Sequence, residues 1–280
     1  MIHPQFVPVS RGATMRTKAK TTFLIHQIVL GGNISRLHRQ CLDSWRALER
    51  RGFDVVRWTD VAVRDYLAVG VPAEVRALYR AARNLGEASD ILRVAITYSY
   101  GGLYVDWDTL LLDADGFLAV MPSFEHSECV LLRDPLTTEP EFACAYDNSL
   151  FFLRRGNPLA LDFLGAMGRN FERTPLPDTP FLTGPLALTR FLEDHPEHRR
   201  ACRFVDTRAV YSFDYGDVHE LTSGQDAREI LRERWQPGTA PAIHFWTHAW
   251  APRPGWGRKM RGWVSRAFRP RSTDPPFPPV

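Results

Sequence analysis

Two carboxylates, Asp106 and Asp108, follow an apolar run in the segment YSYGGLYVDWD, residues 98 to 108. If the strand predicted from this run continues through both, their side chains face the same way while Trp107 turns aside. Two hard oxygen donors suit Mg²⁺ or Mn²⁺, which complete their coordination with substrate phosphates. The pair therefore indicates a divalent metal site beside a phosphate ligand, although Asp-x-Asp is also common in solvated turns.

A helix is predicted directly before this strand. Asn84 and Glu87 resemble a capping box at its start, and Gly101 can supply the left-handed residue after its end. Asp90 and Arg93, three residues apart, share one face of the helix, so a carboxylate for sugar hydroxyls and a guanidinium for phosphate can stand near the metal pair. The alternative is a surface ion pair, worth under about 1 kcal/mol.

The remaining pattern alternates strands with helices over the first half of the chain, which predicts an α/β fold with a Rossmann-like, mostly parallel sheet. Ligands of such sheets bind at the carboxyl ends of the strands. Apolar runs predict strands at residues 21–32, 53–60, 129–133, 148–155 and 241–246, and helical spacing predicts helices at 34–48, 72–83 and 157–171.

The net charge of +3 conceals an uneven distribution. Residues 1–20 hold four basic side chains and no acid, and residues 251–280 hold seven basic side chains against one acid. The part between them therefore carries 24 basic and 31 acidic side chains, a net charge of −7. We expect a flexible basic arm at 1–20, a catalytic domain at 21–250 that does not bind nucleic acid, and a basic, amphipathic, proline-rich tail at 251–280.

The cysteine pattern and the hydropathy of the sequence indicate the cellular compartment and the relation to membranes. Four cysteines without a Cys-x-x-Cys pair argue against a zinc site and favour a reduced, cytoplasmic setting. No apolar stretch reaches the ~18 residues that a membrane span needs. Residues 255–271 nevertheless place an aromatic and aliphatic stripe beside six basic residues, which favours docking on an anionic membrane surface. The alternative is that the stripe packs on the catalytic domain.

Several blocks of the sequence resemble the glycosyltransferases that carry a DXD sugar-binding region. This group, family 32-like, includes yeast-type initiating α-1,6-mannosyltransferases and capsular polysaccharide transferases, and more distantly the clostridial glucosylating toxins. The blocks are IHQIVLGG (25–32), VVRWTD (55–60), ASDILRVAITYSYGGLYVDWD (88–108), Asn148, LTGPLALT (182–189) and HFWTHAW (244–250). The resemblance implies a GT-A fold, a UDP- or GDP-sugar donor, Mn²⁺ or Mg²⁺, a saccharide or lipid-linked acceptor and retention of anomeric configuration.

The resemblance also implies roles for the residues around the DXD motif. Asp90 and Arg93 would bind the donor sugar and the diphosphate. Asp106 would contact the ribose and, through water, the metal, and Asp108 would bind the metal directly. Asn148 would contact the donor sugar, which makes it, with the two metal-site aspartates, a candidate catalytic residue.

Outside that motif, the resemblance places Gly31 and Gly102 against the donor, and His244 and Trp250 over the diphosphate. The sequence departs from the family at Val29, where a tryptophan is usual, so the aromatic platform for the base is missing. It departs again at His248, which stands in place of a glycine. His248 is therefore either a substitute metal ligand or a hydrogen-bonded structural histidine.

Two other functions compete with this interpretation. In a haloacid-dehalogenase-like phosphatase, Asp106 would be the nucleophile and Asp108 the acid, but that class needs a later basic residue with an acidic pair, and all three lysines lie in the two tails. The other is a non-catalytic sugar-binding or membrane-docked module. A second Asp-x-Asp, at Asp113 and Asp115, is interpreted as a polar turn after the strand.

Overall fold

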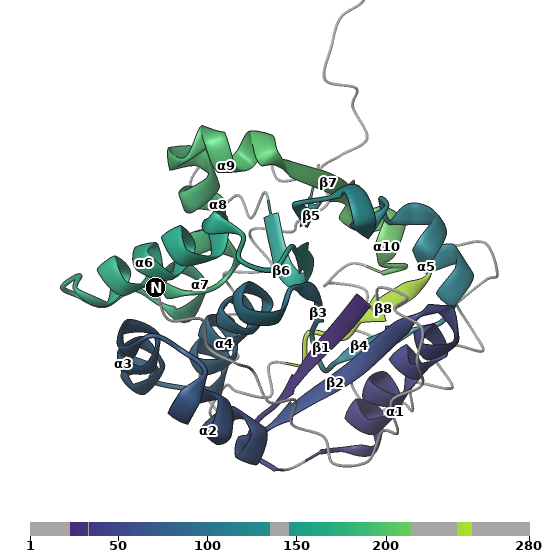
Figure 1. Cartoon of the computed structure of the whole chain (residues 1–280), viewed down its shortest axis with the longest axis horizontal. Helices are drawn as coiled ribbons and strands as arrows, with labels where there is room; N and C mark the ends of the chain where they lie inside the picture. Colours follow the sequence, from purple (N-terminus) through teal and green to yellow (C-terminus); the bar gives the residue numbers. More distant parts are fainter. Residues whose placement is uncertain (1–22, 33, 135–145, 214–239, 248–280) are drawn as a thin grey trace, which may run out of the picture.

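The computed structural model describes residues 23–32, 34–134, 146–213 and 240–247 (Figure 1). Within them a six-stranded sheet forms the centre. Adjacent strands of this sheet are parallel, except that β6 runs antiparallel to both β3 and β5. The expected α/β architecture with a mostly parallel sheet is thereby confirmed. In order across the sheet, the strands are β2 (Phe53–Thr59), β1 (Phe23–Val29), β3 (Gly102–Val105), β6 (Tyr146–Leu153), β5 (Cys129–Arg133) and β7 (Cys202–Asp206).

A second, two-stranded sheet pairs β4 (Thr109–Leu111) with β8 (Ala242–His244) in antiparallel register. Because β4 follows β3 after only a short turn, this small sheet lies next to the carboxyl end of β3. The helices of the described residues are α1 (Arg36–Ser44), α2 (Asp60–Val69), α3 (Ala73–Ala81), α4 (Leu85–Tyr100), α5 (Ala114–Val120), α6 (Pro158–Phe171), α7 (Thr179–Leu182), α8 (Pro185–Asp194), α9 (Pro196–Ala201) and α10 (Thr207–Val210), with 3₁₀ turns η1 (Trp45–Arg51) and η2 (Phe124–His126).

Apolar side chains fill both faces of the central sheet. One cluster packs strand residues such as Ile28 and Phe151 against α2, α3, α4, α6 and α8. The other packs Ile25 and Phe152 against η1, α5 and α10. Because both faces are covered, the sequences of the strands are nearly continuous apolar runs, and the few polar side chains within them are candidates for function.

Helix α4 sets the position of the predicted site. The Asn84 side chain accepts a hydrogen bond from the Glu87 N–H, as the capping signal predicts, and Gly101 ends the helix at φ 69°. The second half of the capping box differs: the Glu87 carboxylate accepts from the backbone N–H of Arg83 and from its guanidinium instead of from Asn84 N–H. The fixed turn at Gly101 leads directly into β3, whose first residue, Gly102, lies so close to β1 that a Cβ there would be 2.5 Å from the Leu24 carbonyl oxygen.

The junction of α4 and β3 also holds a fully buried histidine, His26 of β1. Its Nε2 lies 2.8 Å from the Gly101 carbonyl and its Nδ1 accepts from Trp58 Nε1–H at 3.1 Å, so both ring nitrogens are used by a neutral imidazole. Burial lowers the pKa of His26 to about 4, although the hydrogen bond to Gly101 opposes this.

This lowered pKa makes folding stability depend on pH. Between about pH 6.5 and 4, His26 is protonated in the unfolded chain but not in the folded chain. The free energy of unfolding therefore has its full contribution from the neutral ring above pH 6.5. As the pH falls toward 4, this contribution is lost, roughly 3 kcal/mol in all. We expect urea unfolding at pH 7.5, 6 and 5 to show this slope. His26→Gln, which keeps a donor and an acceptor but cannot titrate, should show a flatter one, and equal slopes would contradict the assignment.

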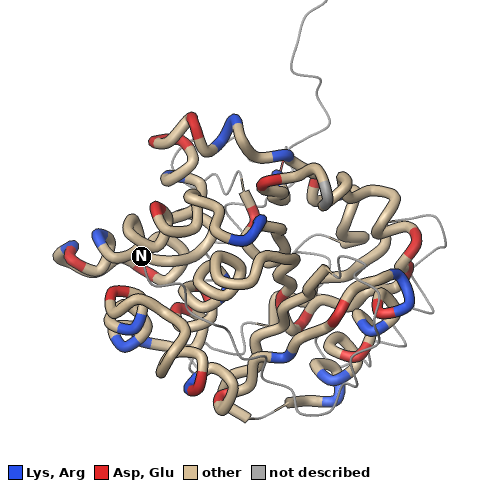
Figure 2. The backbone as a smooth tube through the Cα atoms, viewed as in Figure 1, with Lys and Arg blue, Asp and Glu red and all other residues tan. Residues whose placement is uncertain are grey.

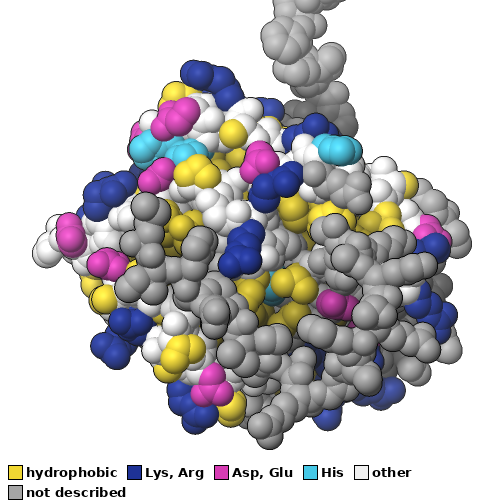
Figure 3. Space-filling view, viewed as in Figure 1, with side chains coloured by type: hydrophobic (Ala, Val, Ile, Leu, Met, Phe, Trp, Pro, Cys, Tyr) yellow, Lys and Arg dark blue, Asp and Glu magenta, His cyan; other side chains and the backbone are white. Residues whose placement is uncertain are grey.

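The surface of the described residues carries mixed charge. Since every lysine lies in the two tails, the basic positions in Figure 2 are arginines, and most lie on outer helices and turns. On the face in Figure 3, arginine, acidic and hydrophobic side chains are interspersed. Among the described helices, none combines the length and the hydropathy that crossing a membrane requires.

Candidate metal and donor site

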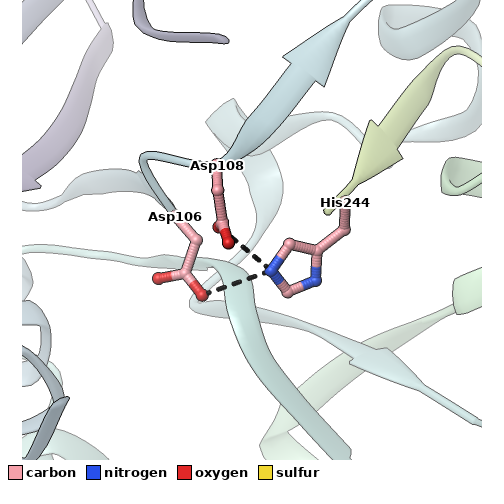
Figure 4. Close-up of side chains that lie close together, drawn as sticks. All are labelled: Asp106, Asp108 and His244. Carbon is pink, nitrogen blue, oxygen red and sulfur yellow. Dashed lines mark ion pairs between the residues drawn. The ribbon is translucent and has the colours of Figure 1, made fainter. Parts of the chain in front are cut away.

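Asp106, Asp108 and His244 meet beside the carboxyl end of β3 (Figure 4). The two aspartates lie in the turn after β3, and His244 ends β8, opposite Thr109 of β4. The His244 Nε2 atom lies 3.2 Å from Asp108 Oδ1 and 3.6 Å from Asp106 Oδ2. Of the described residues, these three form the group of His, Cys, Asp or Glu side chains whose ligand atoms all lie within 4.8 Å of one another.

The two aspartates converge for a different reason than the one predicted. The expectation of a strand through both is wrong, because β3 ends at Val105 and residues 106–108 form a turn that is closed by a hydrogen bond from Thr109 N–H to the Asp106 carbonyl. The turn lets the chain pass from the central sheet into β4. It brings Asp106 and Asp108 to the same ligand group without the i, i+2 geometry of a strand.

Electrostatics distinguish the three groups. Burial raises the pKa of Asp106 to about 6 despite the attraction of Arg93. Burial alone would also raise the pKa of Asp108, but His244 and two hydrogen bonds from Thr247 hold it well below its usual range. Burial alone would lower the pKa of His244, and Asp108 and Asp106 raise it above its usual value. The raised pKa favours the protonated imidazole beside the two carboxylates, and a divalent cation can take the place of that proton.

The donor set fits such a cation. Cis ligands of an octahedral ion with bonds near 2.1 Å are about 3 Å apart, and the nitrogen-to-oxygen distances of 3.2 and 3.6 Å are close to that spacing. Two carboxylates suit Mg²⁺ and Mn²⁺, and the imidazole favours Mn²⁺ of the two. Asp106, with 19% of its side chain exposed, leaves the group open on one side for a ligand.

Arg93 joins this group to α4. Its guanidinium is buried and lies 3.2 Å from both Asp90 Oδ1 and Asp106 Oδ1, and it donates to the Asn148 carbonyl at 2.6 Å. It also lies over the Tyr104 ring, 4.6 Å from the centroid, and the Tyr104 hydroxyl donates to Asp106 at 2.6 Å. Burial alone would lower the pKa of Arg93, but Asp106, Tyr104 and Asp90 raise it, so the cation is permanent.

Asp90 and Asn148 form the other end of this network. The Asn148 amide donates to Asp90 Oδ1 at 3.0 Å, and the Thr183 hydroxyl donates to Asp90 Oδ2 at 2.8 Å. Asn148 lies where β6 is irregular: its register with β5 shifts between Leu131 and Leu132. Such a bulge re-aims side chains, and here it turns Asn148 toward α4 at the edge of the site.

Residues 35–116 match the family model described as "Glycosyltransferase sugar-binding region containing DXD motif". The resemblance is thus confirmed at the level of the DXD glycosyltransferase region. The match spans less than a third of the chain and includes Asp90, Arg93, Asp106 and Asp108, whereas Asn148 and His244 lie beyond it.

Several solved structures that are similar to this chain are named as glycosyltransferases. The chain is similar to PaToxG glycosyltransferase at 20% identity and a TM-score of 0.44, covering 62% of this chain and 70% of that one. It is similar to the ligand-free glycosyltransferase domain of the YGT toxin at 10% identity and a TM-score of 0.47, with coverage of 65% and 80%. It is similar to galactosyltransferase LgtC in complex with donor and acceptor sugar analogs at 10% identity and a TM-score of 0.44, covering 90% of this chain and 98% of that one. A search of curated proteins finds no match.

Gly31 and Gly102, two other predicted donor residues, follow the carboxyl end of β1 and begin the parallel strand β3, respectively. Gly31, in the loop after β1, donates its N–H to the Asp60 carboxylate at 3.2 Å. Gly102 begins β3, at the opposite end of that strand from Asp106, and its closest neighbour is the backbone of β1. His248 and Trp250 lie outside the described residues, as do the basic arm and the tail.

Sequence reasoning missed three contacts of the site. It assigned His244 to the diphosphate and proposed His248 as the third ligand, whereas the structure brings His244 to the two aspartates. It also missed the hydroxyls of Tyr104 and Thr247, which donate to Asp106 and Asp108. The position of His244 at the end of an apolar strand was the available signal, since a buried polar residue there needs a partner.

Proposed function

We propose that the chain is a metal-dependent, retaining glycosyltransferase of GT-A type. It would transfer a sugar from a UDP- or GDP-sugar to a saccharide or a lipid-linked saccharide. The observation that carries the proposal is the Asp106–Asp108–His244 group at a strand end, joined through a buried arginine to Asp90. Support comes also from the DXD-region match over the helix, strand and turn that hold four of these side chains.

Each side chain has a part in breaking the bond between the anomeric carbon and the diphosphate. Negative charge builds on the leaving phosphate; Asp106, Asp108 and His244 would hold a divalent cation, which would supply positive charge against it. The Arg93 guanidinium adds a second fixed charge that costs no reorganisation during reaction. Asp90 and Asn148, already hydrogen-bonded to each other, can orient sugar hydroxyls at the same edge.

The finer parts of this proposal rest on the family resemblance. Retention would follow from attack by the acceptor hydroxyl on the face that the diphosphate leaves. The lack of a Cys-x-x-Cys pair supports a cytoplasmic enzyme. The six basic residues within 255–271, a segment outside the described residues, support docking on an anionic membrane surface, where a lipid-linked acceptor would be found.

A panel of nucleotide sugars tests the function. We expect the full chain to hydrolyse one UDP- or GDP-sugar slowly in Mn²⁺, less well in Mg²⁺, and not at all with excess chelator, because the leaving diphosphate then lacks its counter-charge. Release of the nucleoside diphosphate is followed by chromatography. Activity that chelator leaves unchanged would contradict metal dependence, and inertness toward every donor would contradict the function.

The same panel separates the two competing functions. A haloacid-dehalogenase-like phosphatase would cleave p-nitrophenyl phosphate without any nucleotide, and a sugar-binding module would bind saccharides without turnover. The absence of lysine from the described residues argues against a phosphatase that uses lysine as its later basic residue, since all three lysines of the chain lie in its tails.

A further inference from the structure

The Asp108 carboxylate is held on the side away from His244 by one residue, Thr247. Its Oδ1 faces His244, while its Oδ2 accepts two hydrogen bonds, from the Thr247 N–H at 2.8 Å and from the Thr247 hydroxyl at 2.9 Å. Thr247 is 139 positions away in sequence and follows β8, which ends at His244. Both oxygens of the carboxylate therefore have partners, His244 at Oδ1 and Thr247 at Oδ2, which holds its orientation.

Thr247 is itself held by His38 of α1. The His38 Nε2 lies 3.1 Å from Thr247 Oγ1, and its Nδ1 lies 2.8 Å from the hydroxyl of Ser35, the residue that caps α1. The directions of these bonds follow from the number of hydrogens. An ionised carboxylate only accepts, so the single hydroxyl hydrogen of Thr247 goes to Asp108, and Thr247 must accept from His38 Nε2–H.

In a neutral ring the opposite nitrogen of His38 carries no hydrogen and accepts, so the Ser35 hydroxyl donates to it. This arrangement needs a neutral ring, and burial lowers the pKa of His38 although Asp108 opposes the shift. Trp107, the residue between the two aspartates, stacks on the same ring, with centroids 4.2 Å apart and planes 11° from parallel. His38 is therefore fixed from three sides by residues 35, 107 and 247.

We propose that Ser35, His38 and Thr247 form a positioning relay, in which each hydroxyl or ring N–H donates toward Asp108 and holds its carboxylate ready for the divalent cation. The inference rests on the proposed function, because it assigns these residues to the same metal site. None of the three touches the reacting atoms. Groups that orient a metal ligand are typically worth about 10–100-fold in metal affinity or activity.

The test measures Mn²⁺ binding directly, by the electron paramagnetic resonance signal of the free ion, without nucleotide or turnover. Thr247→Val keeps the shape and the N–H contact but lacks the hydroxyl, and we expect its dissociation constant for Mn²⁺ to rise about tenfold or more. Thr247→Ser restores the hydroxyl and should recover most of that loss. His38→Phe keeps a ring against Trp107 without either nitrogen, and its dissociation constant should rise similarly, with activity recovering at saturating Mn²⁺.

A second measurement does not depend on any variant. Nitrogen-15 chemical shifts of the wild-type protein should show His38 as the Nε2–H tautomer; the Nδ1–H tautomer would overturn the relay. So would equal Mn²⁺ affinities for the wild type and Thr247→Val, or equal losses for Thr247→Ser and Thr247→Val. A wild type that binds no Mn²⁺ at all contradicts the proposed function instead, and this outcome is distinct because it precedes every comparison of variants.

Discussion

Asp108→Asn is expected to abolish Mn²⁺ binding and to lower donor turnover on the order of 10³-fold. The substitution preserves the size of the side chain and an oxygen that can accept from Thr247, but it removes the charge that faces His244 at 3.2 Å. Since a buried amide is less costly than a buried carboxylate, the fold should survive. Isothermal titration with Mn²⁺ and the rate of nucleoside diphosphate release measure the two effects, and circular dichroism checks the fold.

Asp115→Asn is a matched control for this variant. It makes the same substitution in the second Asp-x-Asp of the chain, where Asp115 is 70% exposed and pairs with Arg51 on the surface. Asp113 caps α5 there by accepting from two backbone N–H groups, so this motif begins a helix where a polar turn was expected, and its role is structural. Turnover in Asp115→Asn should match the wild type, whereas wild-type turnover in Asp108→Asn would remove the basis of the metal site.

The sequence was most informative where a site residue is placed by its own helix. Asp90 and Arg93 were predicted to share a face of α4, and they form an ion pair at 3.2 Å. The signals behind this prediction are local: a cap at Asn84, a glycine at the end and apolar side chains at helical spacing. Local signals act within a few residues, so one sequence is enough to find them.

The contacts that needed distant pairing were not predictable in the same way. His244 reaches Asp108 because β8 pairs with β4, more than 130 positions away, and no local pattern encodes which strands pair. The pairing of β5 with β7 could not be predicted either: Cys129 and Cys202 are far apart in sequence but lie opposite each other on these two strands. Helix α2 was missed for a different reason, because β2 passes into it at Thr59 without a glycine or proline to mark the boundary.

Arg93→Met is expected to destabilise the folded protein by about 3–5 kcal/mol, because it leaves the carboxylates of Asp90 and Asp106 buried without their shared cation. Methionine retains most of the contact with the Tyr104 ring, so the loss measures charge more than packing. The midpoint of urea unfolding is the readout. Arg208→Met removes an exposed partner of Asp206 and should shift the midpoint far less, because solvent screens a surface ion pair.

The pH dependence of this loss identifies its cause. Burial raises the folded-state pKa values of Asp90 and Asp106, and Arg93 opposes this. Without Arg93 both pKa values should rise further above their unfolded values, and the two groups can relieve the repulsion by binding protons. A raised carboxyl pKa lowers stability as the pH rises through it, so the deficit of Arg93→Met should be larger at pH 8 than at pH 5. A deficit that stays constant over this range would instead indicate lost packing, and the arginine would then be a structural residue without an electrostatic part in the site.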